Sequence, residues 1–284
     1  MAINNTLYAK RRLVNKLGLL FSVGAMGFGL FWLIWILITL FSQGLQGLLH
    51  MPIFTADTPT GDTVGGLRNA IIGSLMITGL GLVVGTPIGI MTGIYLAEFG
   101  QNSWLARTTR FMNDILLSAP SIVIGLFVYA LMVQGHGFSG YAGSVALALL
   151  VIPVVVRTTE NMLNLVPNTL REAAYALGTP RWKLVSTVTL RAAKAGVMTG
   201  VMLAFARISG ETAPLLFTAL NNQYFSTDMT RAMANLPKVI YDYASLPSDT
   251  AHQLAWAGAL LVTLTVLGVN ILARYIGNKE YESH

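Results

Sequence analysis

The sequence has no cysteine and very few charged residues. Its 284 residues include no Cys, and only 11% are Asp, Glu, Lys or Arg. Without cysteine there is neither a disulfide framework nor a thiolate metal site. The four histidines are scattered without ligand spacing, so we expect no metal centre (His50, His136, His252 and His284). Soluble proteins carry about a quarter charged residues, so the low charge predicts a membrane protein.

The few charges are distributed unevenly along the chain. Four long stretches contain none: Lys16 to Asp57, Arg68 to Glu98, Asp114 to Arg157 and Asp249 to Arg274. A fifth, Lys194 to Asp228, is interrupted only by Arg207 and Glu211. A membrane-spanning helix needs about 20 apolar residues, and the third stretch is long enough for two helices around a Gly-rich turn at 135–140. The sequence therefore predicts an all-α membrane protein with six transmembrane helices, roughly at 17–42, 69–97, 113–134, 141–156, 196–220 and 253–274.

The positive charges predict the orientation of these helices. Cytoplasmic loops of membrane proteins are enriched in Lys and Arg. With a cytoplasmic N-terminal segment, 1–16, most of the 18 Lys and Arg residues fall on the cytoplasmic side, Arg274 and Lys279 near the C-terminus among them. We therefore expect both termini in the cytoplasm and interpret the net charge of +6 as a topology signal, with no nucleic-acid partner.

The longest cytoplasmic loop, 157–195, carries helix start and stop signals. Thr169 and Glu172 have the spacing of a capping box, which predicts a helix start at Thr169. Gly178 predicts a left-handed stop. Thr179 then predicts the cap of a second helix, with Pro180 at its first position. The expected product is two short helices outside the bilayer.

The first of these helices carries a recognisable motif: Glu172, Ala173, Ala174 and, after three more residues, Gly178. The pattern resembles the EAA motif of permease subunits in type I ATP-binding-cassette importers. That resemblance implies a coupling helix that docks on a nucleotide-binding subunit, and Arg181 can hold it there electrostatically. The family's Ile-x-Leu-Pro ending is replaced here by 188–191, which lack the proline.

A phosphate-binding loop ends in Gly-Lys-Ser/Thr, but no Gly-Lys pair occurs in the sequence. We therefore expect a chain that is not an enzyme by itself and binds no cofactor. ATP with Mg²⁺ would be used by a separate ATPase subunit.

A charged pair interrupts the predicted fifth span. Arg207 lies near the centre of 196–220, where insertion of a charged side chain costs about 2.5–3.5 kcal/mol. Glu211 follows one helical turn later and can pair with it. Gly210 and Pro214 favour a loosened helix, as in the broken helices of transporters. The pair is interpreted either as part of an anion pathway or as a buried structural ion pair.

Residues 206–219 resemble the fifth-span signature of phosphate ABC-transporter permeases, the A subunit of the Pst system. The resemblance extends over most of the chain beyond Leu67. It implies a substrate pathway with Arg207, Glu211 and Thr212. Arg157, which is expected to end the fourth span, is a further candidate, although the bias of positive charge toward the cytoplasm also explains it.

The same resemblance implies a single permease domain, 1–284, with its core at about 67–276, in the bacterial inner membrane. The implied partners are a second permease subunit in a heterodimer, two copies of a cytoplasmic ABC ATPase, an external phosphate-binding protein, inorganic phosphate and membrane lipid. Three alternatives stay open: a permease for sulfate or molybdate, an ion-coupled secondary transporter, and a signalling scaffold that moves nothing.

Overall fold

The computed structural model describes residues 5–59, 63, 65–100 and 103–282, with the side chains of Arg274 and Lys279 outside the described part. Within this part every regular element is helical. The α-helices are α1 (Asn5–His50), α2 (Arg68–Ile94), α3 (Trp104–Ser118), α4 (Ser121–Val128), α5 (Gly140–Asn164), α6 (Asn168–Ala176), α7 (Arg181–Lys183), α8 (Leu190–Ser209), α9 (Ala213–Thr218), α10 (Leu236–Ala244) and α11 (Asp249–Glu282). Three π-helical segments, which extend neighbouring helices, are η1 (Tyr95–Phe99), η2 (Tyr129–Val133) and η3 (Leu184–Thr189).

The number of membrane-crossing segments agrees with the prediction. By length and composition, five helices can cross a bilayer, and a bent pair formed by α3 and by α4 with η2 makes a sixth candidate. The bend in that pair is 106°, so the predicted continuous span at 113–134 is wrong. Ala119 is extended (φ −67°, ψ 134°) before Pro120, because a proline disfavours helical geometry in the residue that precedes it.

The longest helix–helix interface joins α2 and α5. Gly81, Gly85, Gly89 and Gly93 form one stripe on α2, and all four are buried. The backbone of α2 comes so close to α5 here that a Cβ added to these glycines would meet the side chains of Leu147, Val151, Val155 and Thr159. Small residues at four-residue spacing permit this close approach in membranes. The fourth span is also longer than the predicted 141–156: α5 continues to Asn164, and Arg157 therefore lies within the helix and not at its end.

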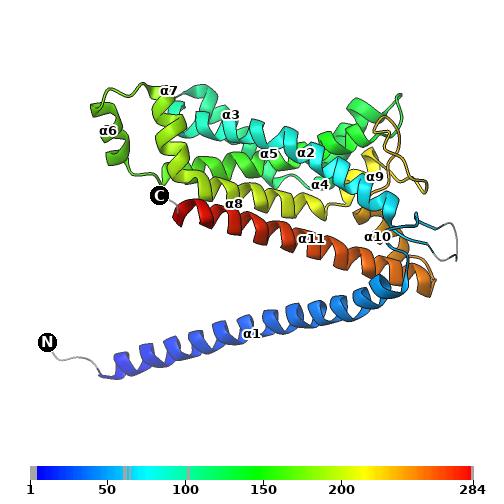
Figure 1. The fold of residues 1–284 in the computed structure, drawn as a ribbon. Helices are drawn as coiled ribbons and strands as arrows, with labels where there is room; N and C mark the ends of the chain where they lie inside the picture. The colour runs from blue at the N-terminus through cyan, green and yellow to red at the C-terminus, as the bar shows by residue number, and fades with distance from the viewer. Residues whose placement is uncertain (1–4, 60–62, 64, 101–102, 283–284) are drawn as a thin grey trace.

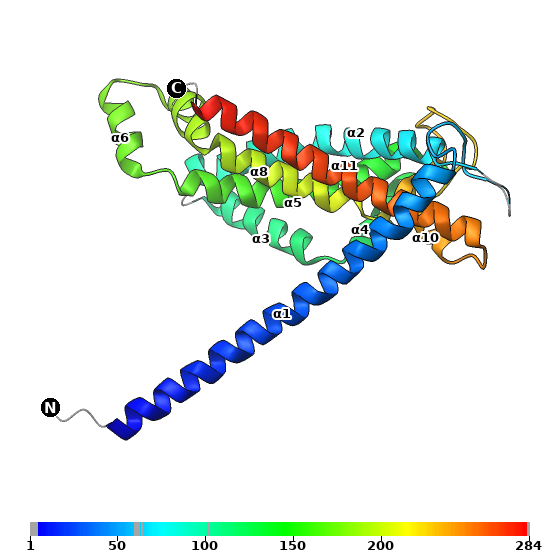
Figure 2. The same ribbon diagram turned by 60° about the horizontal axis from the view of Figure 1, so that its bottom comes forward.

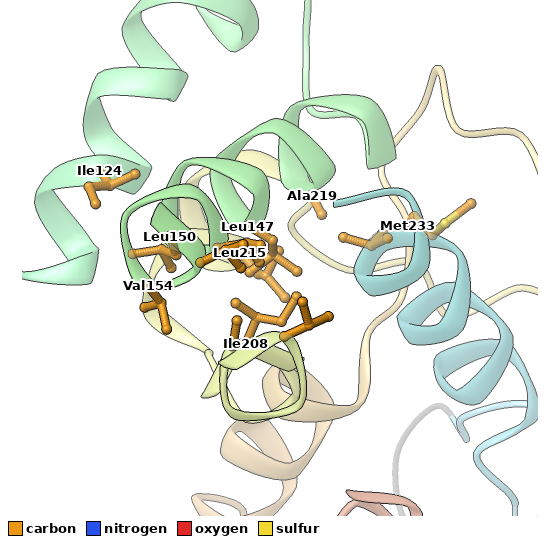
Figure 3. Packing of buried hydrophobic residues seen from close by; sticks show 13 residues of the cluster. Ile124, Leu147, Leu150, Val154, Ile208, Leu215, Ala219 and Met233 are labelled. Atoms are coloured by element: carbon orange, nitrogen blue, oxygen red, sulfur yellow. The ribbon is translucent and has the colours of Figure 1, made fainter. Parts of the chain in front are cut away.

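Apolar side chains from distant parts of the sequence meet on α5 (Figure 3). Ile124 of α4, Leu147 and Leu150 of α5, Ile208 of α8 and Leu215 of α9 belong to one buried cluster. The C-terminal end of α8 and the start of α9 therefore both pack against the centre of the bundle. This cluster fixes the place where the chain leaves α8 and enters α9.

Helix α1 leaves the bundle and extends away from it (Figures 1 and 2). Only its C-terminal end packs closely, where Gly44 approaches Leu260 and Gly47 approaches the Gln253 carbonyl of α11. Most of its large apolar side chains are exposed. It extends beyond the predicted 17–42 in both directions, because no proline or glycine cap stops it before His50.

The bundle has two distinct ends (Figure 1). The α6 end carries α6, α7 and the end of α11, and the start of α1 points to the same side but lies away from the bundle. The α10 end carries α10 and the loops on either side of it, together with the segment between α1 and α2. The direction of each helix is given by the end toward which it runs, the α6 end or the α10 end.

Candidate functional site: a charged helix break and a coupling surface

The charged pair lies at a break between two helices. Helix α8 ends at Ser209, Gly210 is its C-cap, and α9 begins at Ala213. The predicted span 196–220 is therefore two helices, because Pro214 at the start of α9 has no N–H to continue the ladder. At the break, Glu211 N donates to the Ile208 carbonyl at 3.3 Å. Thr212 caps α9 with its carbonyl, which accepts hydrogen bonds from Leu215 N (3.1 Å) and Leu216 N (3.2 Å).

Arg207 and Glu211 still form an ion pair across this break. Arg207 Nε lies 3.8 Å from Glu211 Oε1, which is longer than a hydrogen bond. The Arg207 side chain is 39% exposed and that of Glu211 is 18% exposed. The guanidinium therefore retains donors and surface that are not used by the carboxylate.

The depth of Arg207 follows from helix packing. Gly200 of α8 lies against Thr158 of α5, and α8 runs antiparallel to α5 (Figure 1). Seven residues of helix rise about 10 Å, so Arg207 lies at the level of Val151, near the middle of α5. Gly85, near the middle of α2, contacts Val151 from the other side. Arg207 is thus in the last turn of α8 but at mid-depth in the bundle.

The other two predicted pathway residues are placed differently. Thr212 is adjacent to the pair and partly buried. Arg157 is exposed on α5, six residues beyond Val151 toward the α6 end, or about 9 Å along the helix axis. The structure therefore groups Arg207, Glu211 and Thr212 in one helix break and leaves Arg157 nearer the α6 end.

A cavity of about 200 Å³ lies beside α8, but the charged pair does not line it. Its walls come from α2, α8 and α11 and from Leu236, and they include Phe205 and Ser209 but no charged side chain. An apolar cavity cannot hold an anion by itself. Of the charged pair, Arg207 reaches the surface of the bundle with a side chain that is 39% exposed, whereas Glu211 is largely buried.

The coupling segment is organised around Gly178. The prediction of a left-handed stop is confirmed: Gly178 has φ +75°. The two predicted caps are wrong. Helix α6 begins at Asn168 with Pro167 as N-cap, and α7 begins at Arg181 with Pro180 as N-cap, in both cases without a side-chain cap. Carbonyls of the two prolines accept the first helical hydrogen bonds instead.

The second predicted short helix is also wrong, because α7, η3 and α8 form one continuous helical segment from Arg181 to Ser209. The coupling segment therefore consists of α6, the turn at Gly178 and the start of a membrane-crossing helix. The turn is thus directly continuous with the helical segment that carries Arg207 and ends at Ser209.

A group of exposed side chains surrounds the turn. Leu177 is 87% exposed, Trp182 69% and Tyr175 49%. Glu172 and Ala173 are exposed as well, whereas Ala174 is buried against Leu184 and Val185 of η3. Ala174 thus fixes α6 to η3 and is not available for contact. We call the exposed residues Glu172, Ala173, Tyr175, Leu177 and Trp182 the coupling surface.

Sequence reasoning missed a set of ion pairs at the α6 end. Arg171 Nη2 donates to Glu98 Oε1 at 2.9 Å, and Arg110 Nε donates to Glu160 Oε1 at 2.6 Å. Both carboxylates are nearly fully buried. The signal for Glu98 was its position as the first charge after a 29-residue uncharged stretch. Its partner could not be identified, because 73 residues separate Glu98 from Arg171.

Arg181, expected to hold a partner subunit, also turns toward its own chain. It donates to the main-chain oxygen of Glu98 and lies over the ring of Phe99, with Cζ 4.6 Å from the ring centroid. Its role in holding a partner subunit stays a prediction, and the structure adds an intramolecular contact to it.

The α10 end has its own polar contacts. Asp57 accepts from Arg68 Nε at 3.0 Å, and the Arg68 guanidinium lies over Phe225. Hydrogen bonds from the Thr230 side chain and main chain hold the pKa of Asp228 below its usual value. Burial raises the pKa of Tyr243, whose hydroxyl donates to the Pro59 carbonyl. These loops are thus fixed to one another by polar contacts.

Comparison with known proteins places this arrangement in a family. A family model described as binding-protein-dependent transport system inner membrane component matches residues 85–280. A phosphate transport system permease protein PstA from Yersinia pestis is 58% identical over 96% of this chain and 92% of its own length. A PstA protein from Haemophilus influenzae is 57% identical over 95% of this chain and 96% of its own.

A solved structure agrees at the level of the fold. The crystal structure of a bacterial ABC transporter involved in the import of the acidic polysaccharide alginate has a chain that aligns with a TM-score of 0.61. Identity is 16%, and the alignment covers 94% of this chain and 99% of that one. The chain therefore belongs to the inner membrane component family of binding-protein-dependent transport systems, with PstA permease proteins as its relatives.

Proposed function

We propose that the chain is one permease subunit of an ATP-driven importer of inorganic phosphate. The observation that carries the proposal is the cationic helix break at mid-depth. The relatives named phosphate transport system permease protein PstA at 56–58% identity support phosphate as the cargo. In this proposal Arg207 attracts the anion, and Glu211 limits the positive charge so that phosphate is not held too tightly.

The open position of Arg207 supports a second permease subunit. A hydrophilic pathway needs walls on all sides, and non-helical backbone at membrane depth is tolerated where protein or a water-filled cavity surrounds it. The break at 210–212 lies at the bundle surface, beside an Arg207 side chain that is 39% exposed. A second permease subunit of similar fold would supply the other wall of the pathway.

The coupling surface supports a separate ATPase. Exposed Leu177 and Trp182 are large apolar side chains at the end of a membrane protein, and such patches mark contact sites. Two copies of a cytoplasmic ABC ATPase, using ATP and Mg²⁺, would bind this permease and its partner. The α6 end is then cytoplasmic, together with both chain termini. An external phosphate-binding protein would approach the α10 end.

The function is tested by phosphate uptake into proteoliposomes that contain this chain with its partner permease and ATPase. We expect uptake that requires internal ATP and external binding protein and that survives an uncoupler. Uptake that an uncoupler abolishes would indicate a secondary transporter instead. Competition by excess sulfate or molybdate would indicate a different oxyanion, and absence of any uptake would leave the scaffold alternative.

The coupling surface gives a separate prediction. Replacing Leu177 with Asp places a charge in an apolar contact, and we expect retention of the ATPase on the purified permease to fall about tenfold, since a truncated or mispaired interface anchor costs about 1–2 kcal/mol or more. Retention is measured by co-purification in detergent. Leu246→Asp at the α10 end is the control, because Leu246 is also an exposed leucine. Equal retention in the two variants would contradict the docking role.

A further inference from the structure

We propose that Glu98 is a positioning residue that ties the coupling segment to the end of α2. In this role it makes α2 follow α6 when the ATPase moves. The inference rests on the proposed function, because it needs an ATPase that acts on α6. It concerns a residue outside both the charged helix break and the coupling surface.

The Glu98 carboxylate binds α6 through Arg171. Arg171 Nη2 and Nε donate to Glu98 Oε1 at 2.9 and 3.3 Å. The Glu98 side chain is 7% exposed and that of Arg171 is 16% exposed. When one partner of such a buried pair is removed, the other is left as an uncompensated buried charge. The pair therefore holds α6 at the end of α2.

The same guanidinium also holds the end of α5. Arg171 Nη2 donates to the Leu163 carbonyl at 2.8 Å, and Nη1 donates to the Val166 carbonyl at 2.5 Å. Leu163 lies in the last turn of α5, and Val166 directly follows its C-cap, Leu165. Arg171 thus joins three elements, α2 through η1, α5 and α6, by one planar group with several donors.

The Glu98 main chain binds the other side of the coupling segment. Its carbonyl accepts a hydrogen bond from Arg181 of α7, and the Arg181 guanidinium lies over the ring of the neighbouring Phe99. Glu98 therefore contacts the residues before and after the Gly178 turn, one through its side chain and one through its backbone. Both arms of the coupling segment are attached to a single residue of η1.

Motion of Glu98 would reach the centre of the bundle. Ala97 packs with Leu163 in a buried cluster, and Gly93, one turn before, lies against Thr159. From there the glycine stripe of α2 follows α5 to Val151, at the level of Arg207. Close-packed elements transmit a displacement without absorbing it. The attachment at Glu98 thus joins the coupling surface to the pathway along α2, in addition to the direct continuation through α8.

The first test measures coupling. Glu98→Gln keeps the size of the side chain and removes its charge. In proteoliposomes of the whole complex, we expect the ATP hydrolysed per phosphate transported to rise about fivefold or more, in the range found for substitutions along a coupling path. Glu160→Gln is the matched control, since Glu160 is an equally buried carboxylate whose ion pair is with Arg110 of α3 and not with a residue of α6. A ratio raised equally in both variants, or in neither, would overturn the proposal.

The second test reports the attachment without transport. The chain has no cysteine, so spin labels attach only at introduced ones. We place them at exposed Thr169 in α6 and exposed Phe111 in α3. The distance distribution should broaden clearly in Glu98→Gln and stay narrow in Glu160→Gln. An unchanged distribution in Glu98→Gln would overturn the attachment, whereas a parent complex that transports no phosphate would overturn only the proposed function.

Discussion

Replacing Arg207 with Gln is expected to lower phosphate uptake about 10- to 100-fold, because hydrogen bonds to charged groups contribute about 1.5–3 kcal/mol. The guanidinium is the cationic group of the helix break at mid-depth, and its pairing with Glu211 at 3.8 Å leaves donors for an anion. Initial rates of radiolabelled phosphate uptake at several phosphate concentrations measure the effect. Assembly with the ATPase should be unchanged, because the coupling surface lies at the end of the bundle.

Two further variants separate the pathway role from a structural role. Arg207→Lys keeps a positive charge and should retain more uptake than Arg207→Gln. Glu211→Gln removes the paired negative charge, so phosphate should bind more tightly and leave more slowly. If Arg207→Gln assembles and transports normally, the pair is a structural ion pair and the pathway interpretation is wrong.

The glycine stripe gives the second large effect. We expect Gly89→Ala to lower the free energy of unfolding by about 1–3 kcal/mol, the usual cost of overpacking a well-packed interior. A Cβ at this position would lie 2.7 Å from Val155 Cβ and 2.9 Å from its Cγ1. Val155 is fully buried, so the helices must separate to accept the methyl group. Thermal unfolding of the purified chain in detergent measures the change.

Gly79→Ala is the matched control for this prediction. Gly79 lies on the same helix, and nothing stands within 4 Å of a Cβ built there. Because alanine is favoured over glycine in helices by about 1 kcal/mol, this variant should unfold at the same temperature or higher. Equal destabilisation by the two substitutions would show that the close approach of α2 and α5 is not what matters.

The sequence predicted the number of spans well, because a bilayer imposes length and apolarity on every crossing segment. It could not predict where a proline breaks a helix. Pro87 and Pro153 lie inside α2 and α5, whereas the chain bends at Pro120. The difference is tertiary: Gly125 of α4 packs on the backbone of Pro214 at the start of α9. That contact joins residues far apart in sequence.

In the candidate site, too, local features could be predicted from the sequence and long-range contacts could not. Arg207 and Glu211 are four residues apart, so their pairing could be expected from local spacing alone. The break after Ser209 was indicated by Gly210 and Pro214, but its extent was not. The caps at Thr169 and Thr179 were misplaced because Pro167 and Pro180, with carbonyls that accept the first helical hydrogen bonds, start the helices instead. Glu98 and Arg171 are brought together only by the folded bundle.

The π-helical turn at the end of α2 also bears on how the chain tolerates insertions and deletions. A π turn closes its hydrogen bonds one residue later than an α turn, so η1 holds one residue more than a regular helix end. Deleting any residue of Tyr95–Phe99 would remove that extra position. The segment would then close as a regular α-helix, and the residues after it would keep nearly their present direction relative to the glycine stripe. A deletion within α2, where no extra position exists, would instead rotate Glu98 by about 100° relative to the part of the stripe before it, given 3.6 residues per turn.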